Sequence, residues 1–121
     1  MTQPIRVAVA NRHRLMRALL LETIKGQPDI EAVAEIPDEK DIGRIVNEMN
    51  PEFLIITLDH PNRPSAICDS LLRQHPGMKI LALAPEHNSG IFVWASFNIH
   101  TREVEASEEG ILSTLRSEAK V

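Results

Sequence analysis

The stretch LIITLDHPNRP, residues Leu54–Pro64, decides how the rest of the chain is interpreted. Its aliphatic run predicts a buried strand, and the proline-rich segment that follows predicts a tight loop. In alternating α/β proteins a strand of this kind delivers a chemical group at its carboxyl end. The group delivered here is Thr57, an alcohol that is a poor nucleophile unless a base lies beside it.

Length and composition predict one globular domain over residues 1–121, with 43% hydrophobic and 25% charged residues. A net charge of -4 and only four aromatic residues, three Phe and one Trp, argue against direct nucleic-acid binding. The single cysteine, Cys68, cannot form an internal disulfide, which predicts a reducing, cytoplasmic location. No apolar run reaches the length of a membrane span, so no membrane association is expected.

Strand and helix patterns alternate along the chain. Strands are predicted at Ile5–Ala10, Ile30–Ile36, Phe53–Leu58, Lys79–Ala84 and Ile99–Val104. Helices are predicted from His13 to Lys25, from Pro37-Asp38 to Asn50-Pro51, from Pro64-Ser65 to about His75, from Asn88 or Ser89 through Ala95, and after a Ser107 cap. Strands joined by helices run parallel, which predicts an α/β, three-layer α/β/α sandwich with a five-stranded parallel sheet and flavodoxin-like topology. The last strand is the most polar and is expected at a sheet edge.

The chain resembles the receiver domain of response regulators in two-component signalling, above all receivers joined to helix-turn-helix output domains. The resemblance covers essentially the whole chain and is carried by IRVAVANRHRLMR (Ile5–Arg17), QPDIEAVAEIPD (Gln27–Asp38), NPEFLIITLDHP (Asn50–Pro61), HPGMKILALA (His75–Ala84) and ASEEGILSTLR (Ala106–Arg116). It implies the receiver fold and a role in signal transduction or transcriptional regulation.

The resemblance also implies where a phosphorylation site would lie, and the sequence departs from the pattern there. The acidic pair that holds magnesium in the family falls on Asn11 and Arg12, and the phosphoacceptor aspartate falls on Thr57. The threonine or serine that responds to phosphorylation falls on Ala84, and the lysine of the fifth strand falls on Val104.

The register of the fifth strand is loose, because the usual glycine landmarks are absent. The aromatic switch position of the family falls on Thr101, and a shift of two residues would place Arg102 at the lysine position.

The charge at this site is reversed relative to the family pattern. Three carboxylates carry -3, whereas Asn11, Arg12 and Thr57 carry +1. Each pair of unit charges near 4 Å is worth about 4 kcal/mol at an effective dielectric of roughly 20. A guanidinium cannot be deprotonated, and magnesium prefers anionic oxygen ligands. No metal, no cofactor and no aspartyl phosphorylation are therefore expected.

Arg12 is expected to take the place of the cation and to bond around Thr57 and Asp59, and these three residues form a candidate pocket. The alternative is that Arg12 points into solvent from its loop.

Other chemistry has weak support in the sequence. The five histidines lack metal-ligand spacing, and surface or loop roles are expected for them. Asp59-His60 beside Thr57 suggests a hydrolase triad only superficially, since adjacent residues at a strand end point in different directions. The loop ANRHR contains no glycine, which argues against a dinucleotide or P-loop site.

A partner-binding face is implied by the receiver resemblance at the fourth helix, fifth strand and fifth helix. Its candidate residues are Trp94, Thr101, Arg102 and Glu103. Exposed Trp and Phe are favoured at interface cores, and the charges of this strand suit ion pairs across a homodimer. The alternative is that Phe92 and Phe97 pack in the core and Trp94 is partly exposed.

The sequence therefore predicts a non-enzymatic, phosphorylation-independent pseudo-receiver that acts by protein-protein contact, either free-standing or as part of a longer regulator. Two alternatives stay open. One is an atypical receiver that is phosphorylated on a residue such as Asp59, and the other is a module that binds a small anion or ligand at the carboxyl ends of the strands, where Arg12 favours an anion.

Overall fold

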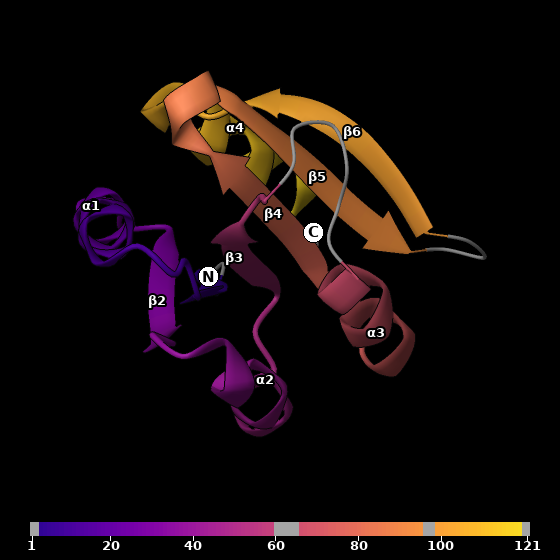
Figure 1. Cartoon of the computed structure of the whole chain (residues 1–121). Helices are drawn as coiled ribbons and strands as arrows, with labels where there is room; N and C mark the ends of the chain where they lie inside the picture. The colour runs from indigo at the N-terminus through magenta and orange to yellow at the C-terminus, as the bar shows by residue number, and fades with distance from the viewer. Residues whose placement is uncertain (1–2, 60–65, 96–98, 120–121) are drawn as a thin grey trace.

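A computed structural model describes residues 3–59, 66–95 and 99–119, which form one mixed sheet flanked by helices (Figure 1). The strands are β1 (Ile5–Val9), β2 (Ile30–Glu35), β3 (Phe53–Thr57), β4 (Lys79–Ala84), β5 (Ser89–Ala95) and β6 (Ile99–Glu105). The α-helices are α1 (Arg14–Lys25), α2 (Ile42–Met49), α3 (Ala66–Gln74) and α4 (Glu108–Glu118). Two short 3-10 turns, η1 (Glu39–Asp41) and η2 (Pro85–His87), complete the chain order.

The sheet has six strands in the order β2-β1-β3-β4-β5-β6. The four strands β1 to β4 run parallel to one another, and their order is that of a flavodoxin-like sheet. β5 runs antiparallel to β4, and β6 runs antiparallel to β5. The α/β prediction is confirmed, but the prediction of five parallel strands is wrong.

The difference begins at the segment that follows β4, where a helix was predicted and a strand is found. β4 runs into η2, Asn88 takes a left-handed backbone conformation with φ 48°, and the chain reverses directly into β5. An α-helix between two strands would carry the chain back across the sheet and make the next strand parallel. The short turn instead forms a β-hairpin, which makes β5 antiparallel.

Gly90 of β5 is tightly packed against both neighbouring strands. A Cβ atom there would lie 2.9 Å from the Leu83 side chain and 3.0 Å from that of Val104. The residue opposite Leu83 in the hairpin must therefore be small, and the glycine permits the close approach of three strands.

β6 is the last strand of the sheet, as its polar composition predicts. Its residues alternate between the two faces, and most of its side chains are exposed. Charged side chains on an edge strand discourage pairing with other chains.

Helices cover both faces of the sheet (Figure 1). α1 and α4 pack on one face, where Leu20, Ile24 and Leu115 join a core with β1, β3, β4 and β5. α2 and α3 pack on the other face, where Val46 and Leu72 join a second core with the same central strands. The predicted three layers are therefore present.

Ser107 caps α4, as predicted from the sequence. Its hydroxyl oxygen accepts a hydrogen bond from the Gly110 backbone N–H at 3.0 Å, and Glu108 and Glu109 lie in the first turn. The negative charges of these side chains stabilise the helix, because they lie at the positive end of its dipole.

Candidate functional site

The carboxyl ends of three neighbouring parallel strands form the candidate site. Asn11 follows β1, Thr57 ends β3 and Ala84 ends β4, and the pairing of these strands places their ends at one edge of the sheet. Ala84 is buried and offers no polar group. The sequence-predicted positions at the ends of β1, β3 and β4 are therefore brought together.

Arg12 makes two contacts across this edge. Its backbone N–H donates a hydrogen bond to Thr57 Oγ1 at 3.0 Å, and its guanidinium forms an ion pair with the Asp59 carboxylate. The structure thus brings Arg12, Thr57 and Asp59 together, with the backbone of Arg12 contacting Thr57 and the side chain contacting Asp59. Both charged side chains are partly exposed, 46% for Arg12 and 38% for Asp59.

The residues present do not fit a magnesium ion. Asp59 is the carboxylate nearest to Thr57 in sequence, and it is paired with Arg12. Throughout the part of the chain that the structure describes, no group of three His, Cys, Asp or Glu side chains could hold a metal ion. A divalent cation here would have to displace a guanidinium and bind with too few anionic oxygens.

The side chain of Asn11 is buried, which the sequence does not predict. Its exposed fraction is 1%, and neither its side-chain oxygen nor its nitrogen has a hydrogen-bond partner among the described residues. Leaving a buried polar group without a partner costs about 1–3 kcal/mol. The amide is therefore an unsatisfied donor and acceptor at the site.

Arg17 holds the loop between β1 and α1 in place, a role that sequence reasoning missed. Its Nη1 donates to the backbone oxygens of Asn11 at 2.9 Å and of Arg12 at 3.0 Å. Its Nε donates to Glu35 at 3.1 Å, at the end of β2. Arg17 lies at the end of the stretch Ile5–Arg17, which carries part of the receiver resemblance. This position was the signal in the sequence that could have indicated the role.

The fifth-strand positions of the family pattern do not reach the site. Val104 lies in β6, and both β4 and β5 stand between it and Thr57. In the shifted register, Arg102 takes the lysine position, and it does not reach the site either. Its guanidinium lies over the Phe92 ring at 5.3 Å and pairs with Glu118 at 2.9 Å. The insertion of β5 as a strand moves the following strand one place further from β3.

The predicted interface residues do not form one patch. Trp94 lies in β5 and its ring stacks on those of Phe92 and His100, each with centroids 5.1 Å apart. Thr101 and Glu103 alternate with Arg102 along β6, so they point to the opposite face of the sheet. The predicted fourth helix of this interface is absent, since β5 replaces it, and Phe97 lies outside the described residues.

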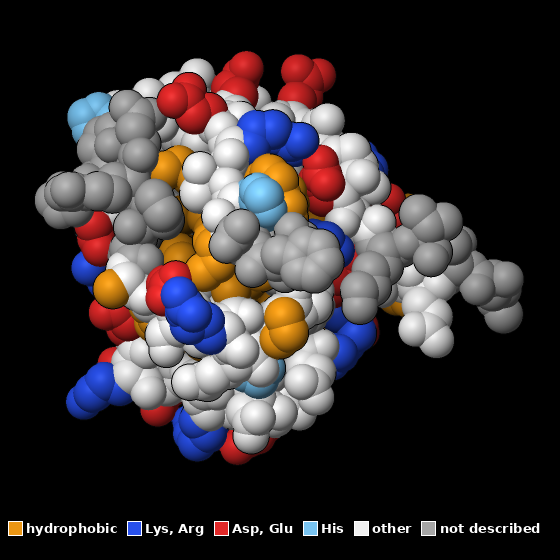
Figure 2. Space-filling view, turned by 90° about the vertical axis from the view of Figure 1, so that its right-hand side faces the viewer, with side chains coloured by type: hydrophobic (Ala, Val, Ile, Leu, Met, Phe, Trp, Pro, Cys, Tyr) orange, Lys and Arg blue, Asp and Glu red, His pale blue; other side chains and the backbone are white. Residues whose placement is uncertain are grey.

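Figure 2 views the molecule from the right-hand side of Figure 1. Hydrophobic side chains gather near the middle of this face, and charged side chains surround them. Five partly buried hydrophobic residues pack against the core shared by α2 and α3: Ala34, Ile45, Ile67, Ala95 and Ile99. An apolar centre within a charged rim is the composition of many protein-binding surfaces.

A cavity of about 270 Å³ opens beside Asn11 and Thr57. Its other walls come from α1, the end of β4 and η2, and include Leu15, Leu19 and Leu83. The cavity is largely apolar apart from Asn11, Thr57 and the residues at its rim. The candidate pocket predicted from Arg12, Thr57 and Asp59 thus shares only Thr57 with this cavity.

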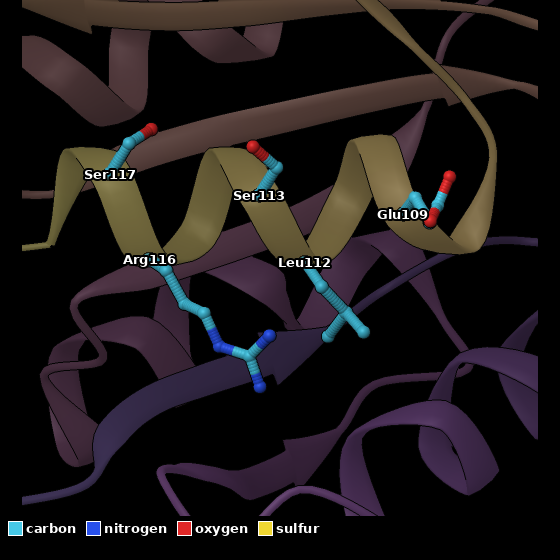
Figure 3. Close-up of a pocket in the computed structure, with 5 residues that line it drawn as sticks. All are labelled: Glu109, Leu112, Ser113, Arg116 and Ser117. Carbon is cyan, nitrogen blue, oxygen red and sulfur yellow. The ribbon is translucent and has the colours of Figure 1, made fainter.

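A second, shallow groove of about 600 Å³ runs along α4 (Figure 3). Arg116, which lines it, donates to Asp29 at 2.8 Å and to Gln27 at 2.7 Å. The hydrogen bond from Arg116 lowers the pKa of the Asp29 carboxyl below its usual value. The guanidinium in this groove is therefore engaged within the protein and ties α4 to the turn before β2.

The Arg12–Asp59 ion pair is expected to add little stability by itself. Exposed pairs contribute about 0.2–1 kcal/mol, so a double-mutant cycle of Arg12→Ala and Asp59→Ala, measured by urea unfolding, should give a coupling energy in that range. The Asp69–Arg73 pair on α3, at 2.8 Å and more exposed, is a matched control. A coupling energy well above 2 kcal/mol would contradict the exposed geometry.

Two curated relatives are similar to part of this chain. Protein-glutamate methylesterase/protein-glutamine glutaminase 1 of Geobacter metallireducens is 30% identical over 76 residues, which cover 62% of this chain and 21% of the relative. Protein-glutamate methylesterase/protein-glutamine glutaminase of Paraburkholderia xenovorans is 31% identical over 75 residues, which cover 61% and 21%. No family model matches the chain.

The matched segment spans about a fifth of the length of these relatives. The methylesterases contain a receiver domain in their N-terminal part, so the similarity supports a receiver domain of two-component signalling. The flavodoxin-like order of β2, β1, β3 and β4 agrees with that assignment. Among the described residues, no helix has both the length and the apolar character needed to cross a bilayer.

Proposed function

We propose that this protein is a phosphorylation-independent pseudo-receiver that acts in signal transduction or transcriptional regulation through protein-protein contact. The observation that carries the proposal is the ion pair between Arg12 and Asp59 at the strand ends, where the receiver resemblance places a magnesium site. A guanidinium there repels the cation that aspartyl phosphorylation of receivers requires.

The chemistry of Thr57 supports the same proposal. Its hydroxyl oxygen accepts a hydrogen bond from the Arg12 backbone N–H, and the nearby Asp59 carboxylate is occupied by the Arg12 guanidinium. Attack by an alcohol on a phosphoryl group needs a base to take its proton. No such base contacts Thr57 among the described residues, so we propose that the protein is not an enzyme.

Contact with another protein would let such a domain transmit a signal without phosphorylation. The apolar area within a charged rim in Figure 2 supports this role. A homodimer through β5, β6 and α4 also stays a proposal, although Arg102, the arginine of β6, is already paired with Glu118 of the same chain. The lone cysteine supports a cytoplasmic location.

The alternative of a small-anion module has less support. Arg12, the cation that favoured an anion, is neutralised by Asp59, and Glu86 lies at the rim of the apolar cavity. The alternative of phosphorylation on Asp59 is opposed by the same ion pair, since the carboxylate would have to leave its guanidinium to react.

Incubation with acetyl phosphate and magnesium tests the proposed function. We expect intact-mass spectrometry to show no added phosphoryl group, while a receiver with its acidic pair and aspartate, treated in parallel, becomes labelled. Beryllofluoride with millimolar Mg²⁺ should likewise leave the melting temperature unchanged. A phosphoryl group mapped to Asp59 would overturn the proposal.

A further inference from the structure

Two leucines on α1 are exposed beside the cavity at Asn11. Leu15 is 73% exposed and Leu19 is 56% exposed, and within the described residues they are the large hydrophobic side chains that face solvent. They are four residues apart and therefore lie on the same face of the helix. Both line the cavity, so the apolar surface continues from its interior onto α1.

Asn11 supplies a buried amide without hydrogen-bond partners among the described residues to the wall of this cavity. Its amide is buried, lines the cavity and has an unpartnered donor and an unpartnered acceptor among the described residues. In an extended peptide, the C=O of a residue can accept from the Asn11 side-chain nitrogen and its N–H can donate to the Asn11 side-chain oxygen. His13 and Leu15 also line the cavity, and because both are exposed they can change rotamer at small cost to admit such a group.

We propose that this cavity binds an extended peptide segment of a partner protein, with an aliphatic side chain in the cavity and a backbone amide against Asn11. The inference rests on the proposed function and deepens it, because it adds a partner site of defined chemistry on α1, apart from the apolar area of Figure 2.

Size and charge favour an uncharged peptide over other occupants. The cavity, at about 270 Å³, is below the range of roughly 300–1,000 Å³ typical of small-molecule sites. A cavity of this size suits one or two aliphatic side chains of a peptide. Leu15 and Leu19 then cover the neighbouring peptide residues, which lie outside the cavity. An anion gains nothing, because the guanidinium of Arg12 is paired with Asp59 and Glu86 adds negative charge at the rim.

A random-peptide display library panned against the whole protein tests the inference, with counter-selection against the variant L15S/L19S. We expect enriched peptides to share an aliphatic residue and to bind the wild-type protein at least about tenfold more tightly than L15S/L19S. Both leucines are exposed, so this variant should fold. Ala18→Ser, at an exposed position of the same helix, is the matched control and should leave the affinity unchanged.

The variant Asn11→Leu separates recognition from structure. A leucine of similar size removes the unsatisfied amide, so the melting temperature should stay the same or rise while peptide affinity falls about tenfold. Amide chemical shifts in an NMR titration should change around Asn11, Leu15 and Leu19.

Three outcomes would overturn the inference: no peptide is enriched, enriched peptides bind N11L as tightly as the wild type, or N-acetyl-leucine methylamide alone binds as tightly as the peptides. The last result would identify a small-molecule site. The acetyl phosphate experiment reads the proposed function separately, since labelling of Asp59 would refute that proposal whether or not peptides bind at the cavity.

Discussion

Replacing Arg17 with alanine should lower the free energy of unfolding by about 2–4 kcal/mol. The side chain is buried, and its guanidinium bonds the backbone oxygens of Asn11 and Arg12 and the carboxylate of Glu35. Removing it leaves two carbonyls of the β1–α1 loop without their donor and opens a cavity beneath the loop. Urea unfolding followed by circular dichroism measures the loss.

Two variants separate the hydrogen bonds of Arg17 from its charge. Arg17→Lys keeps the charge but loses the two-pronged donor, and should retain only part of the stability. Glu35→Gln should cost less than about 1 kcal/mol, because the Glu35 side chain is 46% exposed. An Arg17→Ala protein as stable as the wild type would show that the loop does not depend on this side chain.

The parallel half of the fold follows from the sequence because its periodicity is clear. Strands such as β3 and β4 are buried on both faces and appear as short, continuous apolar runs. Helices such as α1 place apolar residues at intervals of three and four. Each of these patterns fits one kind of element, so the order of strands and helices up to Ala84 was predicted correctly.

For the segment from Ser89 to Ala95, the sequence pattern does not distinguish a strand from a helix. Gly90, Phe92 and Val93 are all buried, so a strand that is covered on both faces and a short buried helix share one apolar pattern. Asn88 was interpreted as a helix cap, whereas its left-handed backbone makes it the last residue of a turn. The segment forms a strand in its tertiary environment, where Gly90 packs between β4 and β6 with no room for a larger side chain.

The site was predictable at the level of strand ends and not at the level of side chains. Because β1 and β3 are neighbours, Arg12 and Thr57 had to lie close together. That Thr57 would contact the backbone of Arg12, and that Asn11 would be buried, depends on rotamers and loop geometry. Sequence patterns carry little information on either.

Restoring carboxylates at three positions should convert the site into one that binds magnesium. In the variant N11D/R12D/T57D, the charge of these residues changes from +1 to -3, and Asp59 is released from its partner. Without metal we expect the variant to be less stable than the wild type by about 2–5 kcal/mol, since a buried carboxylate and mutual repulsion replace neutral or paired groups. Added Mg²⁺ should recover about 1.4 kcal/mol at a concentration tenfold above its Kd.

Thermal unfolding with and without millimolar Mg²⁺ measures this effect, with T57D as the control. In T57D the guanidinium of Arg12, which pairs with Asp59 at the same strand ends, keeps its positive charge, so magnesium should give no stabilisation. The wild-type protein should also show none. R12D/T57D should be stabilised by Mg²⁺ in part, because it lacks the Arg12 charge that opposes the cation. If Mg²⁺ stabilises the wild-type protein as much as the triple variant, the electrostatic account of the site is refuted.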